Sequence, residues 1–339
     1  MRQKILDFIF SYGLMGLGVL FIFIASASIK TGNFPILKFP ASGQRAAMAE
    51  TGGDNAPVNL PSSKPIIPLP KDKTEFNGKL SAAAAYVVDD VTDTVLYEKN
   101  ADVVRPLASI TKLMSVLVLA DLPVQWTTTT IIQAEDCEDS SKQIVAGEKF
   151  TLDDLWNIAL IASSNSAVNA LVRSSGFNQE QFALLMNRKA KDLKLLSANF
   201  VEPTGLDAGN VASARDVALL LKESVRFSKI CKAMHTAEYY AHPVDQQKAL
   251  RVWTTNWLLT NWVPNEFKVG DIAGKTGYIA DSGYNFTVRL TNANGHSIRV
   301  VVLGTVSNEA RFTEARDLAH WTFNHYLWPE DAGYDKLAE

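Results

Sequence analysis

The sequence predicts an α+β fold in which helices cover both faces of an antiparallel sheet. Strand patterns occur near the start of the folded region and again near its end, helical patterns fill the sequence between them, and short turns join the strands within each group. Strands joined by short turns pair antiparallel, whereas a parallel sheet needs a crossover between successive strands. The pattern therefore favours a sheet sandwiched by helices over a β-α-β series.

The predicted strands form two pairs. The first pair covers 83–88 and 94–97, where apolar and β-branched residues flank a short acidic turn. The second pair covers 285–290 and 297–303, and the connection Asn292-Ala293-Asn294-Gly295 is a good hairpin turn.

Four helices are predicted from apolar periodicity and capping residues. The first covers 109–122 and places its apolar residues on one stripe. The second follows Thr151, whose spacing to Asp154 is close to a capping box, and the third follows Ser213 as its cap. The last covers about 308–326. The stripe on the first helix consists of Leu113, Val116, Leu117 and Ala120.

Composition excludes several classes of protein. The 339 residues are 47% hydrophobic, which is enough for one large domain or two small ones. A net charge of -3 argues against a nucleic-acid partner. Five histidines without metal-ligand spacing and two cysteines give no metal centre, and we expect no cofactor. Cys137 and Cys231 could pair in an oxidising compartment or remain buried free thiols.

The N-terminus predicts export. Arg2 and Lys4 precede an uncharged run over 8–29, which as a helix would be about 33 Å long, enough to cross a bilayer. The run is longer than the roughly 7–15 apolar residues of a secretory signal, which slightly favours an uncleaved anchor, although Ala25-Ser26-Ala27 resembles a cleavage site. The positive flank places everything after Lys30 outside the cytoplasm.

Four regions follow from this organisation. A stretch rich in Pro, Gly, Ala and Ser reads as an extended linker, because proline removes backbone donors and disfavours helix. The predicted regions are a signal peptide or membrane anchor over 1–30, the linker over 31–79, the folded domain over 80–328 and a tail over 329–339.

Three short elements carry residues suited to acyl transfer by a serine. In the first, Ser109 and Lys112 lie three positions apart at a helix start, so the amine can reach the hydroxyl and take its proton. The orphan N–H groups of a helix start also stabilise negative charge. Alone this spacing is weak, because a helix start with a solvated lysine gives the same pattern.

The other two elements are also weak individually. Ser163 and Asn165 could relay a proton and hold a substrate, or simply end a helix. Lys275, Thr276 and Gly277 offer a charge, a hydroxyl and a close backbone approach to an anionic substrate, or form an edge strand with a solvated lysine.

In the order S-x-x-K, S-x-N and K-T-G, the three elements are much more specific. If they converge, two lysines would share one serine, and their mutual repulsion together with partial burial would favour a neutral Lys112 amine that acts as a base.

Together these elements resemble the low-molecular-mass penicillin-binding proteins, the serine D-alanyl-D-alanine peptidases, from about Ala82 to Trp321. The residues that carry the resemblance are Tyr97-Glu98-Lys99-Asn100-Ala101-Asp102, Arg105-Pro106-Leu107-Ala108-Ser109-Ile110-Thr111-Lys112, Gly147-Glu148-Lys149-Phe150-Thr151-Leu152, Phe200-Val201-Glu202-Pro203-Thr204-Gly205-Leu206, Asn210, Ser213-Ala214-Arg215-Asp216, Thr255-Asn256, Gly283-Tyr284 and Arg311.

The resemblance implies a β-lactamase/transpeptidase-like fold with a mostly helical subdomain, and it assigns site residues. The residues implied in catalysis are Ser109, Lys112, Ser163 and Asn165. The residues implied in substrate binding are Lys275, Thr276, Gly277, Tyr278 and Arg311.

In that scheme Ser109 would be acylated with Lys112 as its base. The backbone N–H groups of Ser109 and Tyr278 would form an oxyanion hole. Lys275 and its neighbouring threonine would contact the terminal carboxylate of the substrate, with help from Arg311. The alternative for Arg311 is a solvated charge at the start of an exposed helix.

The partners implied are peptidoglycan stem peptides, β-lactams as covalent inhibitors, and the membrane if the N-terminal segment stays attached. The implied location is the periplasm or the outer face of the cytoplasmic membrane. The finer likeness is to D,D-endopeptidases, which cut cross-links, and it is carried by 102–109 and 200–216. The short sequence after the last helix also departs from the carboxypeptidase branch. Ile279 and Ser166 replace the threonine and the acidic residue usual in the family, which bears on substrate preference and rate.

Two other functions remain open at this stage. A class A β-lactamase has a similar set of elements and uses a glutamate for rapid hydrolysis; Glu202 follows Asn165 at a tempting distance, but its surroundings favour a loop residue. Rapid nitrocefin turnover would identify that enzyme. A catalytically idle, membrane-tethered wall-binding protein is the second alternative, and it would take up penicillin without changing any muropeptide.

Overall fold

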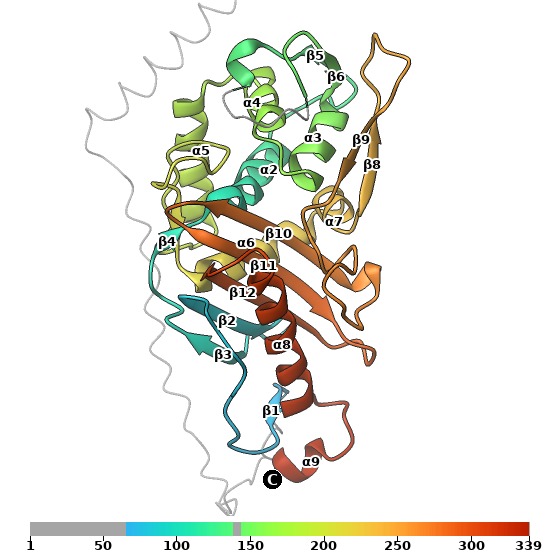
Figure 1. The fold of residues 1–339 in the computed structure, drawn as a ribbon. Helices are drawn as coiled ribbons and strands as arrows, with labels where there is room; N and C mark the ends of the chain where they lie inside the picture. Colours follow the sequence, from blue (N-terminus) through green and yellow to red (C-terminus); the bar gives the residue numbers. More distant parts are fainter. Residues whose placement is uncertain (1–65, 138–143, 339) are drawn as a thin grey trace, which may run out of the picture. The chain divides into compact units, whose positions relative to one another are not determined.

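A five-stranded antiparallel sheet lies at the centre of the computed structural model, which describes residues 66–137 and 144–338 (Figure 1). The order of the strands is β10-β11-β12-β2-β3, so β10 and β3 form the two edges. The strands are β2 (Ala84–Asp89), β3 (Val95–Lys99), β10 (Ile272–Ile279), β11 (Gly283–Thr291) and β12 (Ser297–Thr305). The predicted α+β class and the two predicted strand pairs are confirmed.

The pairing of β2 with β12 joins the beginning of the domain to its end. Val87 lies opposite Val300 in this antiparallel pair. Almost every residue of β12 is buried, because both faces of the sheet are covered. A strand buried on both faces is apolar along its length rather than alternating, which explains the run Val300–Leu303.

A helix group covers each face of the sheet. Helix α8 (Ala310–His325) packs on one face, where Phe312 and Leu318 contact Phe286 and its neighbours. Helix α6 (Ala214–Arg226) packs on the other face, where it adjoins the larger core cluster. Ser213 caps α6 by accepting a hydrogen bond from the Asp216 N–H, as predicted.

The remaining helices form a mostly helical part above the sheet (Figure 1). They are α2 (Thr111–Asp121), α3 (Leu152–Ile161), α4 (Asn165–Ser174), α5 (Gln179–Asp192) and α7 (Ser228–Met234). Thr151 caps α3 through a 3.0 Å bond from the Asp154 N–H, which confirms the predicted start of that helix. Ser164 and Asn178 cap α4 and α5 in the same way.

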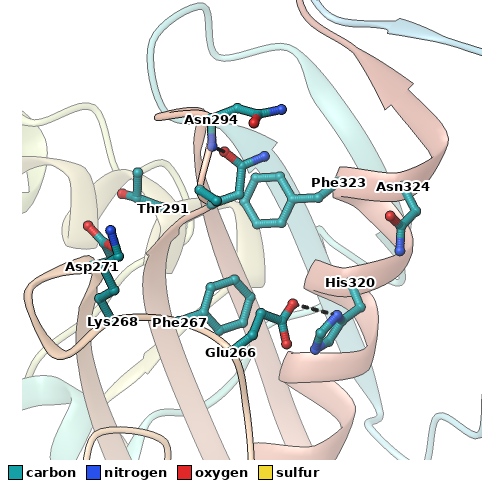
Figure 2. Close-up of a pocket in the computed structure, with 11 residues that line it drawn as sticks. Glu266, Phe267, Lys268, Asp271, Thr291, Asn294, His320, Phe323 and Asn324 are labelled. Carbon is teal, nitrogen blue, oxygen red and sulfur yellow. Dashed lines mark hydrogen bonds and ion pairs between the residues drawn. The ribbon is translucent and has the colours of Figure 1, made fainter.

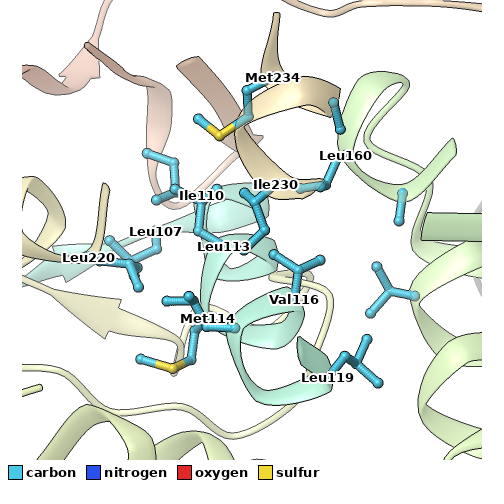
Figure 3. Packing of buried hydrophobic residues seen from close by; sticks show 14 of the residues in the cluster. Leu107, Ile110, Leu113, Met114, Val116, Leu119, Leu160, Leu220, Ile230 and Met234 are labelled. Atoms are coloured by element: carbon cyan, nitrogen blue, oxygen red, sulfur yellow. The ribbon is translucent and has the colours of Figure 1, made fainter. Parts of the chain in front are cut away.

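Helix α2 is buried on all sides, so the predicted single apolar stripe is wrong. Every residue from 111 to 119 is buried, because α3, α4, α5 and α6 all pack around it. Figure 3 shows Met114 and Val116 on opposite sides of α2, and both are buried in this core. Its buried polar residues, including Lys112 and Ser115, consequently need partners inside the protein.

Small two-stranded sheets and short helices complete the fold. The paired strands are β4 (Arg105–Pro106) with β7 (Val211–Ala212), β5 (Thr129–Ile131) with β6 (Lys149–Thr151), and β8 (Glu238–Ala241) with β9 (Leu250–Trp253). The 3-10 helices are η1 (Ala108–Ile110), η2 (Ala134–Asp136) and η3 (Val269–Asp271). Cys137 and Cys231 are both free thiols.

The compact unit begins before the predicted Leu80 and includes the predicted tail. Strand β1 (Leu69–Pro70) pairs with β13 (Tyr326–Leu327), and the Phe76 ring lies edge-on to two aromatic rings of the domain. Beyond α8, Tyr334 in α9 (Tyr334–Ala338) is buried and donates to the Ile67 carbonyl at 2.7 Å. A proline-rich segment reads locally as a linker, but an extended chain can also form a short edge pair, which only the tertiary contacts reveal.

The predicted N-terminal segment over 1–30 and most of the predicted linker lie outside the described residues. Within 66–137 and 144–338, none of the helices has the length and apolar character needed to span a bilayer.

Candidate active site

Ser109 lies in a 3-10 turn rather than in the first turn of the predicted helix. The turn η1 precedes α2, which starts at Thr111, and Ser109 is half-buried. Ala108 has a φ of +49°, a left-handed conformation that is unfavourable for residues other than glycine. Such strain persists only when the surrounding structure imposes it.

Two glycines allow neighbouring segments to pack closely against this turn, and that packing fixes its position. A Cβ on Gly277 of β10 would lie 2.5 Å from the Leu107 carbonyl oxygen, and a Cβ on Gly205 would lie 2.0 Å from the Ala108 carbonyl oxygen. The sequence suggested that Gly277 admits the substrate. What approaches it most closely is the turn of the protein that holds Ser109.

Asn285 fixes the same turn from β11. The register of β11 against β12 shifts between Tyr284 and Phe286, and a bulge of this kind re-aims the side chain at that position. The buried Asn285 amide donates to the carbonyls of Pro106 and Leu107 at 3.0 and 3.2 Å, and it accepts from the Gly304 N–H.

The Lys112 amine lies at the centre of the site. It is fully buried and donates to Ser109 Oγ at 2.9 Å, to the Thr204 carbonyl at 2.6 Å and to Asn165 Oδ1. The predicted reach from Lys112 to Ser109 is confirmed. A neutral amine in this position keeps its two N–H bonds to Asn165 and Thr204 and turns its lone pair toward the serine hydroxyl, which is the arrangement for removing a proton.

Ser163 and Asn165 lie in the sharp connection between α3 and α4. Ser163 has a φ of +61°, again left-handed, and Asn165 is the first residue of α4. Because of this turn, Ser163 Oγ accepts from Lys275 Nζ at 2.7 Å while Asn165 Oδ1 accepts from Lys112. One short segment thus contacts both lysines.

Lys275 on edge strand β10 is buried, not solvated. Its side chain is 1% exposed, and its amine also donates to the Thr276 carbonyl at 3.0 Å. Burial lowers the pKa of Lys275 well below its ordinary value of 10.5, and the positive charges of Lys112 and Arg311 lower it further. Thr276 Oγ1 shares a 2.6 Å hydrogen bond with Thr255 Oγ1.

Arg311 near the start of α8 is also buried, so the interpretation as a solvated charge is wrong. It is 7% exposed and donates from Nη1 to the Gly277 carbonyl at 3.1 Å. Burial lowers the pKa of Arg311 to about 10, against an opposing effect of Tyr284. Within the described part of the chain, the carboxylates form no ion pair with Arg311 or Lys275, and Arg311 Nε has no hydrogen-bond partner.

Eight of the nine predicted site residues therefore meet through side-chain contacts or close packing around Ser109. The ninth, Tyr278, directs its half-exposed ring against Tyr284 at 4.3 Å. The role predicted for it uses only the backbone N–H next to Gly277.

The sequence did not predict the loop residues that position the Lys112 amine. Thr204 contributes a backbone carbonyl, which no side-chain pattern marks. Glu202 organises that loop: it accepts from the N–H groups of Thr204 and Gly205 at 2.6 and 2.5 Å, from the Thr204 hydroxyl at 2.7 Å and from the Asn210 amide. The interpretation of Glu202 as a loop residue is confirmed.

A separate hollow of about 260 Å³ lies at the other end of strands β10 and β11 (Figure 2). Its walls include Asp271, Thr291 and the Glu266–His320 ion pair. Asp271 precedes Lys275 by four positions, about 13 Å along a strand. None of the predicted site residues lines this hollow.

Fold and site together define the class of protein, which is a serine acyl-transfer enzyme. Residues 71–307 match the family described as D-alanyl-D-alanine carboxypeptidase. The chain is 31% identical over 261 residues to a D-alanyl-D-alanine endopeptidase of Pseudomonas aeruginosa, covering 75% of this chain and 81% of that one. It is 30% identical to the D-alanyl-D-alanine endopeptidase of Escherichia coli K12, covering 76% and 83%. The chain therefore belongs to this family and is a serine-type D-Ala-D-Ala peptidase, a low-molecular-mass penicillin-binding protein of the D,D-endopeptidase subgroup.

The same fold occurs in a solved structure of the Streptomyces K15 DD-transpeptidase. The TM-score is 0.67 at 23% identity, over 74% of this chain and 100% of that one. The predicted transpeptidase-like fold is confirmed.

Replacing Glu202 with glutamine should slow acylation by penicillin by roughly tenfold, equivalent to about 1.4 kcal/mol of barrier. All the contacts of Glu202 described above come from donors, so the N–H₂ group of glutamine in place of one oxygen would face other donors. The loop would then rearrange, and the Thr204 carbonyl would shift away from Lys112. Stopped-flow acylation measures the effect. Asp207→Asn keeps its acceptor for the Gly209 N–H and serves as the control. An unchanged acylation rate in Glu202→Gln would show that this loop does not position the base.

Proposed function

We propose that this protein cleaves D-Ala-containing cross-links between peptidoglycan stem peptides through an acyl-enzyme on Ser109. The observation that carries the proposal is the 2.9 Å contact between Ser109 Oγ and the buried Lys112 amine, which Asn165 and Thr204 hold in place. The endopeptidase relatives, both at 30% identity or more, support cross-links as the substrate.

Acylation begins when Lys112 takes the proton of the Ser109 hydroxyl and the serine oxygen attacks the D-Ala carbonyl carbon. The backbone N–H groups of Ser109 and Tyr278 stabilise the oxyanion. The C–N bond then breaks, and the amine of the neighbouring stem peptide leaves with the proton that Lys112 took, which Ser163 relays. The Lys112 amine then removes a proton from water, which attacks the ester carbonyl. The proton returns to the oxygen of Ser109 as the ester breaks, which restores the serine.

The substrate carboxylate next to the scissile bond binds between Lys275 and Arg311. Both cations are buried without a carboxylate partner among the described residues, and a cation buried in this way favours an anionic ligand. Thr276 Oγ1, held by Thr255, adds a hydroxyl on the same strand. Asn165 orients the stem peptide with its amide group while its oxygen holds Lys112.

The protein acts outside the cytoplasm, where its substrate is. Support comes from the basic residues and the apolar run over 8–29 at the N-terminus, which predict export and attachment to the membrane or cleavage of the segment.

Slow release of bound penicillin follows from the position of Glu202. A class A β-lactamase needs a glutamate carboxylate that activates water beside the acyl-enzyme. The Glu202 oxygens instead accept hydrogen bonds from the backbone and side chains of their own loop.

Ser109→Ala should abolish covalent labelling by a fluorescent penicillin, and Lys112→Ala should slow it by at least about a hundredfold, because the attacking oxygen or its base is lost. Gel fluorescence after denaturation measures the bound label. Ser174→Ala, at an exposed serine on α4, is the control and should label like the native protein. Undiminished labelling of Ser109→Ala would refute the assignment of the nucleophile.

The efficiency of acylation by penicillin should fall as the pH rises. The fall should begin at a lower pH than the pKa of an ordinary lysine would give. The pKa of Lys275 is lowered, so its positive charge is present below that pKa and is lost above it, before pH 10.5 is reached. Acylation efficiency measured against pH should therefore fall on the alkaline side. A penicillin methyl ester, which has no carboxylate for Lys275 to hold, should lack this fall. If acid and ester give the same alkaline profile, Lys275 does not bind the carboxylate as a cation.

The purified full-length protein should cleave a cross-linked dimer muropeptide at least about tenfold faster than it trims a monomeric pentapeptide. Both substrates present the same D-Ala carbonyl, so the difference reports how the site accepts the leaving group. Chromatography of the products measures both rates, with Ser109→Ala as the blank. Release of D-Ala from the pentapeptide with an intact dimer would identify a carboxypeptidase instead.

A further inference from the structure

A hollow lined by three tryptophans lies beside the active site and takes no part in the reaction described above. Its volume is about 590 Å³. The residues that line it are Ala237, Trp253, Thr254, Trp257, Thr260 and Trp262. They belong to the base of the β8–β9 hairpin and to the loop that leads from it toward β10. We call this hollow the tryptophan groove.

The indole rings in the tryptophan groove are open to solvent to different extents. Trp262 is 72% exposed and Trp253 is 52% exposed, whereas Trp257 stacks on Phe312 at 5.4 Å. Trp262 is inclined by 52° to Trp257, with ring centroids 5.5 Å apart. The Arg251 guanidinium lies 4.2 Å over the Trp253 ring. Exposed tryptophans that are held by rigid neighbours present flat apolar faces that a ligand can cover.

The tryptophan groove adjoins the catalytic strand through one peptide unit. Thr254 lines the groove, and the next residue, Thr255, bonds to Thr276 on β10 at 2.6 Å. The Thr255 N–H also donates to the Ile161 carbonyl at the end of α3, two residues before Ser163. Neighbouring Cα atoms are 3.8 Å apart, so the groove begins one residue from a contact to the strand that carries Lys275.

We propose that the tryptophan groove binds the sugar rings of the substrate, and this inference rests on the proposed action on peptidoglycan. A stem peptide in the active site is attached to its glycan, so the glycan lies within the length of one stem peptide of the active site and can reach the groove. The groove lining contains no charged side chain, so it does not match the carboxylates and amines of a second stem peptide.

The chemistry of the lining matches N-acylated pyranose rings. Flat indole faces pack against the C–H faces of a sugar ring, and apolar sites with a few polar groups at the rim are typical of small-ligand pockets. The hydroxyls of Thr254 and Thr260 supply that rim. Each makes one hydrogen bond to the backbone, with the Asn256 N–H and the Trp257 carbonyl, and a hydroxyl has capacity for a further bond to a sugar.

The test uses full-length protein and glycan strands from which an amidase has removed all stem peptides. The native protein should bind these strands, and Trp253→Ala/Trp262→Ala should weaken binding by at least about tenfold. Trp253→Phe/Trp262→Phe, which keeps aromatic faces, should retain most of the binding. Leu196→Ala removes an exposed apolar side chain that is distant in sequence from the groove, and it is the control for general surface effects.

Kinetics separate this inference from the proposed function. The alanine double variant should acylate with penicillin at the native rate, and it should lose activity through a raised KM on cross-linked muropeptides that carry sugars, with no change on the same cross-linked peptides without sugars. Equal binding of stripped glycan by the native protein and the alanine variant, or no binding by either, would overturn the groove assignment. An equal loss on sugar-free peptides would overturn it too, because the groove would then be a peptide or protein site. Failure of the native protein to acylate or to cleave would instead refute the proposed function.

Discussion

The amine of Lys112 is the point on which the rest of the structure depends. A lysine with no exposure to solvent is tolerated only when oxygen atoms surround its nitrogen, and here they come from the nucleophile turn, from α4 and from the 202–205 loop. Each of these segments needs its own support. The carboxylate of Glu202 orders the loop, Ser164 caps α4, and Asn285 fixes the turn from the sheet.

The burial of two cations, Lys275 and Arg311, beside the Lys112 amine is costly, and it favours the binding of an anion. Burial lowers the pKa of both Lys275 and Arg311, and the charge of Arg311 lowers the pKa of Lys275 further. Carbonyl and hydroxyl oxygens satisfy part of their hydrogen-bonding capacity but provide no compensating negative charge. A carboxylate that enters the site supplies that charge, so the free protein is preorganised for an anion rather than for a neutral group.

The sequence predicts the parts of this site that depend on side-chain identity and local spacing. The three-residue interval between Ser109 and Lys112 is a local property of a helical turn, and the strand pairs and the caps at Thr151 and Ser213 are also local. The resemblance to a known family then predicts that the S-x-N and K-T-G motifs belong to the same site as Ser109 and Lys112.

The parts that the sequence did not predict depend on long-range packing. The left-handed Ala108 and Ser163 are ordinary residues whose conformation is imposed by segments distant in sequence. The burial of α2 on every side, the carbonyl of Thr204 and the pairing of β1 with β13 likewise arise from contacts between segments far apart in the chain. No local pattern reports a backbone oxygen or the number of helices that surround a helix, so apolar periodicity alone suggested a single buried face.

The start of α8 links the side of the site that is proposed to bind the substrate carboxylate to the tryptophan groove. Arg311 donates to the Gly277 carbonyl and lies 4.9 Å over the Phe312 ring, and Phe312 in turn stacks on Trp257. Phe312 is fully buried in the core on that face of the sheet, so its ring cannot move without disturbing the packing of α8 on β11. The separation between the cation and the indole is therefore set by the core rather than by a surface loop. A fixed separation of this kind suits a substrate in which an anionic group and a sugar are joined by a chain of limited length, because little conformational entropy of the protein is lost when both ends bind.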